Sequence, residues 1–268
     1  MILLSHEPSI PAADPSRAHA LAARKNGPPI AALTAYDYPT ARLLDESGID
    51  LILVGDSLGM MVYGHPDTTA VTLGDMVRHT AAVRRGVRRA CLVADLPART
   101  YAAPGQAVAS ARELVGAGAD AVKLEGGRSI LPQIQAILAD GIPIVGHLGM
   151  LPQHVLEEGG YRRKGKQPAE AETLLADASA LDQAGVSALV LESIVASVAA
   201  EMTLCVRCPT IGIGSGRETD GQVRVIHDLV GAYPWFRPPF AECYHDTAAL
   251  VRDAARRFRE SLAPPDPT

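Results

Sequence analysis

Residues 51–60 read LILVGDSLGM, so an apolar run that looks like a buried strand leads directly into the carboxylate of Asp56. A single acid after a hydrophobic run is commonly a helix cap or a turn residue. Several such endings require an architecture that brings them together. Four further runs end in the same way: CLVADLP reaches Asp95, AVKLEGG reaches Glu125, PIVGHLG reaches His147 and ALVLES reaches Glu192.

Short β-branched runs alternate with segments of helical period along the chain, which indicates repeated βα units and a parallel sheet. The strand runs are apolar on both sides, as expected when both faces of a sheet are covered. Eight strands are predicted, at residues 30–35, 50–54, 90–94, 120–124, 142–146, 187–191, 209–213 and 222–227. Helices are predicted between them at residues 39–47, 73–86, 105–117, 129–140, 170–184 and 194–204. This order favours a closed (β/α)8 TIM barrel over an open sheet. The last connection, about eight residues long, is too short for a full crossover helix.

Two predicted helices fall outside the repeat. One starts at Asp14-Pro15, a cap followed by proline, runs to about Arg24 and could plug the bottom of the barrel. The other spans roughly residues 246–262. We expect residues 1–268 to form a single domain, with residues 1–12 flexible and 263–268 a frayed tail.

The bulk properties favour a small-molecule partner. A net charge of −5 without a basic cluster argues against nucleic acid or an anionic membrane surface. The N-terminus lacks the pattern of a signal or transit peptide, and no apolar run approaches the ~20 residues needed to span a bilayer. We therefore expect a cytoplasmic protein. Its four cysteines form no disulfide pattern, and the Cys205/Cys208 pair is interpreted as structural rather than as a zinc or redox site.

In a parallel barrel, the residues just beyond the strand C-termini gather on one rim, even when they are far apart in sequence. Crowded carboxylates repel one another and need a cation to neutralise them. Oxygen ligands suit a hard divalent ion, and Mg2+ is the first choice; zinc is disfavoured because only one histidine is close to the cluster. The expected rim group is Asp56, Asp95, Glu125, His147 and Glu192, with Lys123 near the mouth of strand four.

Some alternatives stay open for individual residues. Lys123 is expected to point into the barrel, where a buried amine needs an anionic partner; a Schiff-base role is the second interpretation. The segment GIGSG, residues 212–216, could offer backbone N–H groups to a phosphate but is more typical of a tight turn. The long connection 148–169 is typical of a lid or an interface segment.

Longer stretches of the chain resemble the ketopantoate hydroxymethyltransferase family over about residues 30–231. The stretches that carry the resemblance are LTAYDYPTARLLDESGIDLILVGDSLGM, VTLGDMVRHTAAVRRG, LVADLP, GADAVKLEGG, GIPIVGHLGMLPQ, GGYRRKGK, ALVLE and PTIGIGSGRETDGQVRVIHDLVG. The resemblance implies a barrel of the phosphoenolpyruvate/pyruvate type, Mg2+ dependence, 5,10-methylenetetrahydrofolate as one-carbon donor, and a homodecamer of two pentameric rings.

The resemblance also implies roles for the rim residues. Glu192 corresponds to the proton acceptor and catalytic base. Direct metal ligands are expected at Asp56 and Asp95, with Glu125 as a further one. The 2-oxo acid is expected to contact Asp56, Ser57, Asp95, Lys123 and His147. The chain departs from the family pattern in four places. Residues 98–101 read ARTY where the family has a sequence close to FMSY, and SIVA follows Glu192 in place of CVPA. GSG stands in place of GAG, and residues 64–68 differ as well.

Three functions follow as hypotheses. The first is transfer of a hydroxymethyl group from methylenetetrahydrofolate to 3-methyl-2-oxobutanoate through a Mg-stabilised enolate, giving 2-dehydropantoate for pantothenate synthesis, or the same transfer to a different 2-oxo acid. The second is a Mg-dependent 2-oxo acid lyase or aldolase on the same barrel. The third, a catalytically idle barrel, is disfavoured because every expected acid is present.

Overall fold

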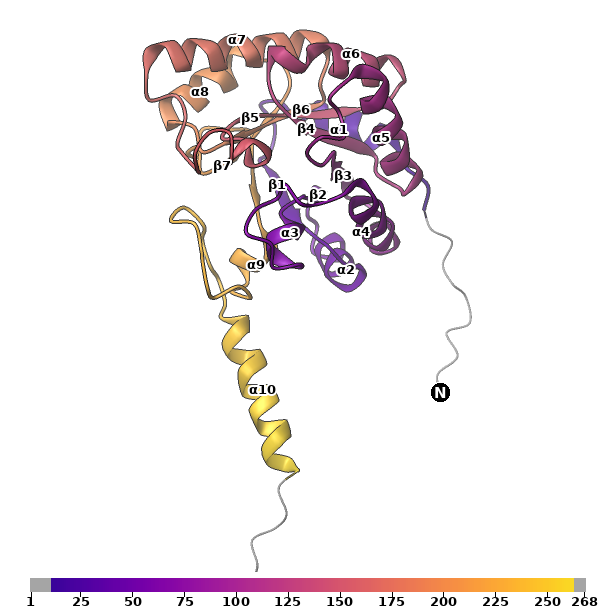
Figure 1. Ribbon diagram of the computed structural model, residues 1–268, viewed down its shortest axis with the longest axis vertical. Coiled ribbons are helices and arrows are strands. Elements are labelled where there is room, and N and C mark those ends of the chain that lie inside the picture. The colour runs from indigo at the N-terminus through magenta and orange to yellow at the C-terminus, as the bar shows by residue number, and fades with distance from the viewer. Residues whose placement is uncertain (1–10, 263–268) are drawn as a thin grey trace, which may run out of the picture. The chain divides into compact units, whose positions relative to one another are not determined.

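The computed structural model describes residues 11–262 (Figure 1). Its eight strands form one closed barrel in chain order. Every ladder that joins consecutive strands from β1 to β8 is parallel. The predicted (β/α)8 architecture is therefore confirmed. The strands are β1 (Ile30–Thr34), β2 (Leu51–Val54), β3 (Cys91–Asp95), β4 (Ala121–Glu125), β5 (Ile144–Gly149), β6 (Ala188–Glu192), β7 (Thr210–Ile213) and β8 (Gly221–Arg224).

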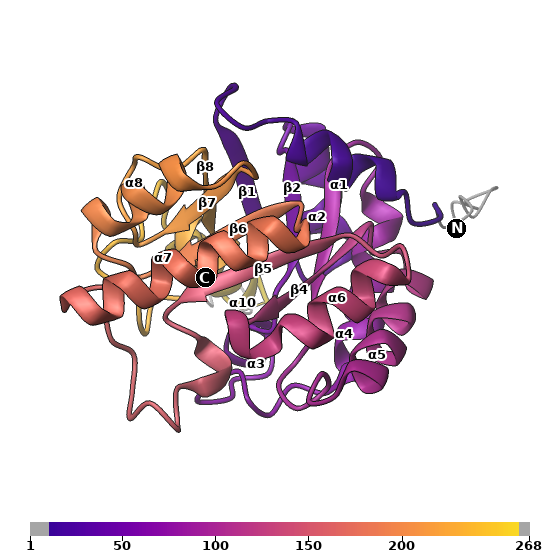
Figure 2. The same cartoon turned by 90° about the horizontal axis from the view of Figure 1, so that it is seen from above.

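Helices follow most of the strands and surround the barrel (Figure 2). As the short spacing predicted, the described connection from β7 to β8 contains no helix. None of the helices in residues 11–262 has the length and apolar character needed to cross a membrane. The helices up to β7 are α1 (Pro15–Ala22), α2 (Tyr38–Glu46), α3 (Leu58–Met61), α4 (Leu73–Gly86), α5 (Pro104–Gly116), η1 (Arg128–Ile130), α6 (Leu131–Ala139), η2 (Pro152–His154), α7 (Pro168–Ala184) and α8 (Ala196–Cys205).

The predicted end of the eighth strand is wrong. Strand β8 ends at Arg224, and helix α9 (Ile226–Leu229) occupies residues that the β-branched run had suggested as strand. The reason lies in the backbone, because the N–H groups of Asp228 and Leu229 both donate to the carbonyl of Val225 at 3.1 Å. Helical hydrogen bonding therefore takes over directly after the short β8 ladder.

The chain divides into two compact units, one ending at Val223 and the other beginning at Arg224. The second unit contains α9 and α10 (Thr247–Ser261), and the carboxylate of Asp246 caps α10 by accepting from the N–H of Ala249 at 2.9 Å. The predicted C-terminal helix is confirmed, whereas a single domain over 1–268 stays a prediction. The expectations for residues 1–12 and 263–268 fall mainly or wholly outside the described residues.

Helix α1 closes the bottom of the barrel, as its sequence suggested. Asp14 caps it by accepting from the N–H of Ser16 at 3.1 Å, and Pro15 takes the first helical position. Ala18 and Leu21 are buried in the same apolar cluster as the inward-facing residues near the strand N-termini. The interior below the rim is therefore a packed core rather than a channel.

A buried ion pair braces the outside of this lower end. The guanidinium of Arg84 on α4 lies 3.1 Å from the carboxylate of Asp120, and neither side chain is exposed to solvent. Asp120 also accepts from the N–H of Leu92 at 2.9 Å, which ties it to the second residue of β3. Gly118 adopts φ 108°, and any Cβ there would lie 2.4 Å from the Arg84 side chain, so the arginine needs a glycine beside it.

Candidate active site

The barrel strands change from apolar to polar along their inward faces. Successive inward positions on a strand are two residues apart. On β4, Ala121 belongs to the buried apolar cluster, whereas Lys123 and Glu125 follow it at the upper end. The same step of two leads from Val93 to Asp95 on β3, from Val145 to His147 on β5 and from Val190 to Glu192 on β6. The sequence prediction that these polar residues share one rim is borne out by their positions.

The strand register then decides which of these side chains meet. Asp95 pairs with Lys123 across the β3–β4 ladder, and Glu125 pairs with His147 across β4–β5. The ammonium Nζ of Lys123 lies 2.9 Å from Asp95 Oδ1 and 3.9 Å from Glu125 Oε1. All four residues are buried, so these charges interact with little screening by water.

His147 stands between two acids. Its Nδ1 lies 3.2 Å from Glu125 Oε1, and its Nε2 lies 3.3 Å from Glu192 Oε2. Burial and the charge of Lys123 lower the pKa of His147, but Glu125 and Glu192 outweigh them and raise it to about 9. The imidazole is therefore protonated at neutral pH, and its positive charge lies between the acid of β4 and the acid of β6 at ion-pair distance, without a well-aligned hydrogen bond to either.

Asp56 and Ser57 lie in the turn between β2 and α3. The backbone N–H of Asp56 donates to Asp95 Oδ2 at 3.0 Å, so the turn is anchored to the end of β3. The hydroxyl of Ser57 is 2.8 Å from the phenol oxygen of Tyr36, a residue that the sequence analysis did not select. Tyr36 is buried and comes two residues after β1, at the position of the other rim residues, which is the signal that could have found it.

Gln153 is the second residue that the sequence analysis missed, and it connects more of the cluster than any acid does. Its Nε2 donates to Asp56 Oδ2 at 2.8 Å and to the carbonyl of Leu96 at 2.9 Å. Its backbone N–H donates to Glu125 Oε2 at 3.1 Å, and its Oε1 accepts from the phenol of Tyr101 at 2.6 Å. The only sequence signal was a lone amide in the apolar segment LGMLPQ, inside one of the family-like stretches.

The ionisation of the acids reflects their crowding. Burial raises the pKa of Asp56 well above its usual range, and the charges of Asp95 and Glu125 raise it further. Burial also raises the pKa of Asp95, with Lys123 opposing. For Glu125 burial acts in the same direction, but His147 and Lys123 prevail and lower its pKa. Asp56 and Asp95 thus have too little positive charge around them to offset the cost of burying their ionised forms.

Lys123 carries a firmly held charge. Burial alone would lower its pKa, but the carboxylates of Asp95, Glu125 and Asp56 more than compensate and raise it. A protonated amine cannot attack a carbonyl group. The geometry therefore favours the ion-pair interpretation of Lys123 over the Schiff-base alternative.

The donor set fits Mg2+. Oδ1 of Asp95 and Oε1 of Glu125 are buried and have cationic neighbours, Lys123 at 2.9 Å and His147 at 3.2 Å, but neither oxygen accepts a well-aligned hydrogen bond, so lone pairs remain for a metal ion. Residues 11–262 contain no preformed cage of three or more His, Cys, Asp or Glu ligands. Mg2+ does not require one, because it is commonly held by one or two carboxylates, with waters and substrate oxygens completing an octahedron.

Other candidate features serve the scaffold. In the GIGSG turn, the hydroxyl of Ser215 donates to the carbonyl of Leu191 at 2.8 Å and accepts from the N–H of Ile194 at 3.0 Å. This residue braces the loop after β6, which agrees with the tight-turn interpretation. Cys205 and Cys208 are both free thiols, one exposed and one buried, and burial raises the pKa of Cys208 to about 12.

The long connection after β5 approaches the rim. The phenol of Tyr161 donates to Met60 Sδ of α3 at 3.9 Å. Burial raises the pKa of Tyr161, and the carboxylates of Asp67, Glu192, Asp56 and Glu125 raise it further. The long connection thus contacts α3, the helix that follows Asp56 and Ser57.

The fold defines the class first: the chain is a (β/α)8 barrel, and similar barrels are found among solved structures. The structure of 2,3-dimethylmalate lyase, described as a member of the PEP mutase/isocitrate lyase superfamily, matches with a TM-score of 0.65 at 17% identity over 96% of this chain and 92% of the other. A phosphonopyruvate hydrolase solved with oxalate and Mg2+ matches with a TM-score of 0.65 at 14% identity, over 93% and 92% of the two chains. At such identities the likeness shows the fold alone.

Sequence comparison identifies the family. The family model of ketopantoate hydroxymethyltransferase matches residues 16–264. A 3-methyl-2-oxobutanoate hydroxymethyltransferase of Ignicoccus hospitalis is 50% identical over 239 residues, which cover 89% of this chain and 90% of the relative. The chain belongs to the ketopantoate hydroxymethyltransferase family.

Proposed function

We propose that this protein adds a hydroxymethyl group to C3 of 3-methyl-2-oxobutanoate, with 5,10-methylenetetrahydrofolate as the one-carbon donor, and so forms 2-dehydropantoate for pantothenate synthesis. Family membership and the name of the Ignicoccus relative support the reaction. The observation that carries the proposal is the buried cluster of acids, lysine and histidine at the upper ends of β3 to β6.

Asp56 and Asp95 are the proposed ligands of Mg2+, with Glu125 as a further one, directly or through water. Oδ1 of Asp95 and Oε1 of Glu125, which accept no well-aligned hydrogen bond, support the assignment of those two residues, and Asp56 is joined to them through the hydrogen bond from its backbone N–H to Asp95. When bound, Mg2+ would polarise the ketone oxygen of the 2-oxo acid and stabilise the negative charge that develops there as C3 loses a proton.

Glu192 is the proposed base that removes this proton. Its side chain is 15% exposed, whereas those of Glu125, His147 and Asp95 are 3% exposed or less, so a substrate can reach it most easily. His147 lies against Glu192 Oε2 and fixes the carboxylate at the rim. The electron pair left at C3 then forms a bond to the methylene carbon of the folate, and water supplies the hydroxyl group as the folate nitrogen leaves.

The remaining polar groups hold the substrate in position. Lys123 is a fixed positive charge deep in the site and suits the carboxylate of the 2-oxo acid. The Ser57 hydroxyl, aligned by Tyr36, can contact the same group. His147 would line the pocket beside them.

We also propose a cytoplasmic enzyme that assembles as a homodecamer of two pentameric rings. All four cysteines are free, which suits a reducing compartment. Large apolar side chains exposed on α10, among them Leu250, Val251 and Phe258, support burial of this helix in an assembly. Light scattering of the purified chain tests the size of the assembly.

One assay tests the reaction. The purified protein is incubated with Mg2+, methylenetetrahydrofolate and a panel of branched and straight-chain 2-oxo acids, and the products are analysed by mass spectrometry. We expect a product 30 mass units above 3-methyl-2-oxobutanoate, the mass of added CH2O, and no product without the folate. Cleavage of a 2-oxo acid in the absence of folate would instead identify a lyase.

A further inference from the structure

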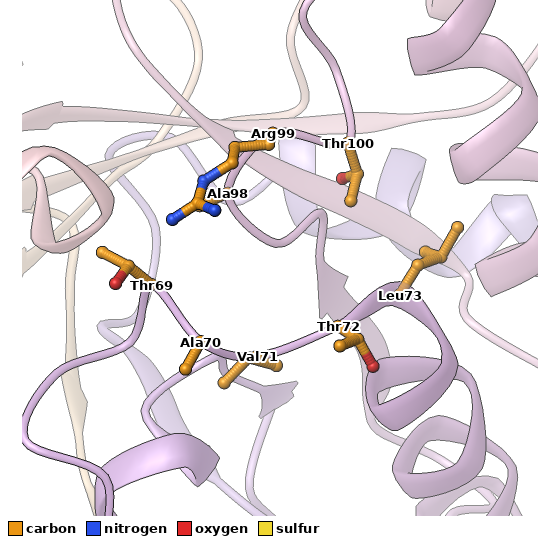
Figure 3. A pocket seen from close by; sticks show the side chains of 8 residues that line it. All are labelled: Thr69, Ala70, Val71, Thr72, Leu73, Ala98, Arg99 and Thr100. Atoms are coloured by element: carbon orange, nitrogen blue, oxygen red, sulfur yellow. The ribbon is translucent and has the colours of Figure 1, made fainter.

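An open cleft of about 470 Å³ lies between two loops of the barrel rim (Figure 3). The loop before α4 supplies Thr69–Leu73, and the loop after β3 supplies Ala98–Thr100. No residue of the acid cluster lines it, so this cleft is not the site described above. Its volume falls in the range of small-molecule sites, and apolar and polar side chains contribute equally to its lining, but the cleft is open to solvent rather than enclosed.

Arg99 is the one charged side chain that lines the cleft. Figure 3 shows its guanidinium reaching from the upper loop toward Thr69 on the opposite side. Among the described residues it forms no ion pair within 4 Å. Hydrogen bonds from Thr69 lower the pKa of Asp67, and the charge of Arg99 lowers it further, but Asp67 lies beyond ion-pair distance, so the guanidinium can still pair with a ligand.

The threonines of the cleft are already committed as donors. The hydroxyl of Thr69 donates to Asp67 at 2.6 Å, that of Thr72 to Asp75 at 2.5 Å, and that of Thr100 to the carbonyl of Pro97 at 2.7 Å. A ligand that enters the cleft thus finds apolar side chains, threonine hydroxyls that already donate elsewhere, and one cation that forms no ion pair within 4 Å. Such a combination selects a flat or apolar body that carries a carboxylate.

The loop 97–101 couples this cleft to the acid cluster. At one end of the loop, the phenol of Tyr101 donates to Gln153 Oε1 at 2.6 Å inside the site. At the other end, only Leu96 separates the loop from Asp95. Arg99, two residues before Tyr101, has φ 69°, in the left-handed region that favours glycine. The N–H of Thr100 closes this turn on the carbonyl of Pro97 at 3.2 Å. The turn thus holds an arginine at a position whose backbone conformation favours glycine.

From this arrangement we infer that the cleft binds the 4-aminobenzoyl-glutamate tail of the one-carbon donor, with Arg99 pairing with a glutamate carboxylate. The inference rests on the proposed function, because that function supplies a donor with an aromatic ring and an anionic tail. In this arrangement the aromatic ring would lie against the apolar wall of Ala70, Val71 and Leu73.

Three variants test the role of Arg99. Arg99→Gly removes the guanidinium and relieves the left-handed backbone, so the fold is kept. Arg99→Lys retains the charge. Arg42→Gln is the matched control, an exposed arginine on α2 that lies outside the cleft and pairs with Glu46.

Steady-state kinetics and a binding measurement give the readouts. In Arg99→Gly we expect KM for methylenetetrahydrofolate to rise about tenfold, with smaller effects in Arg99→Lys and none in Arg42→Gln. KM for the 2-oxo acid and folate-independent exchange of its C3 proton should stay at the wild-type level. Added salt should raise the folate KM of the wild type more than that of Arg99→Gly.

Binding of 4-aminobenzoyl-L-glutamate alone, followed by ligand-observed NMR, needs no turnover. We expect binding to the wild type and loss of binding in Arg99→Gly. Absence of binding to the wild type, equal binding to both proteins, or an unchanged folate KM in Arg99→Gly would overturn the inference. If the wild type forms no product from any 2-oxo acid, the proposed function fails. The NMR experiment still tests whether the cleft binds 4-aminobenzoyl-L-glutamate through Arg99.

Discussion

Replacing Gln153 by leucine tests whether one amide organises the acid cluster. Leucine has nearly the same size but keeps only the backbone N–H that donates to Glu125. The substitution removes the donor to Asp56 Oδ2 and to the carbonyl of Leu96, and the acceptor of the Tyr101 phenol. Three buried polar groups would lose a partner at once, in a region that water barely reaches.

The magnitude follows from these contacts. A hydrogen bond to a charged group contributes about 1.5–3 kcal/mol and a neutral one about 1 kcal/mol, so the three lost bonds amount to roughly 3–5 kcal/mol. Burial of the added leucine atoms returns about 1 kcal/mol. A net loss of about 3 kcal/mol corresponds to a Tm lower by roughly 6–12 °C for a chain of this size. The affinity for Mg2+ should fall about tenfold or more, because Asp56 loses the group that orients it.

Calorimetry measures both effects, by a thermal scan and by titration with Mg2+. Gln133→Leu is a matched control, because Gln133 Nε2 makes a single hydrogen bond, to the carbonyl of Ala102 at 3.2 Å near the surface. It should cost no more than about 1 kcal/mol and leave Mg2+ binding unchanged. A Tm within about 2 °C of the wild type together with unchanged Mg2+ affinity in Gln153→Leu would refute this account of Gln153.

Four further predictions concern single residues. Glu192→Gln should slow deuterium exchange at C3 of 3-methyl-2-oxobutanoate by about 10²–10⁴-fold while titrations still detect Mg2+ binding, and normal exchange would remove Glu192 as the base. Asp95→Asn should weaken Mg2+ binding in calorimetric titration, and wild-type affinity would argue against a ligand role. Because its amine is held protonated, Lys123 should not be trapped by borohydride with the 2-oxo acid, whereas a mass-labelled adduct there would restore the imine mechanism. Asp120→Ala should lower the free energy of unfolding by about 3–5 kcal/mol by leaving Arg84 buried without its partner, as denaturant melts would show, with kcat of the folded enzyme unchanged.

The sequence was sufficient for features that depend on a regular period. Apolar strands and helical crossovers predict the barrel, and a parallel barrel brings the strand ends to one rim, so Asp95, Glu125 and Glu192 could be grouped before any coordinates were known. The order of contacts could not be predicted, because it depends on the register that pairs Lys123 with Asp95 and His147 with Glu125.

Features set by loops were out of reach for the same reason. Gln153 comes from η2, and only the path of the chain after β5 brings its amide to Asp56. Tyr36 and Tyr101 likewise reach the site from turns. The end of β8 was misjudged because Val225 and Ile226 have side chains typical of strands, whereas their backbone turns into α9.

The division along each inward strand face has a consequence for evolution of this barrel. On β4, Ala121 belongs to the apolar interior, whereas Lys123 and Glu125, on the same face, belong to the chemistry. Substitutions in the lower layer can therefore alter the packing of the barrel without replacing a group that takes part in the chemistry. A single strand thus carries packing at one inward position and chemistry at the next, separated by about 7 Å of backbone.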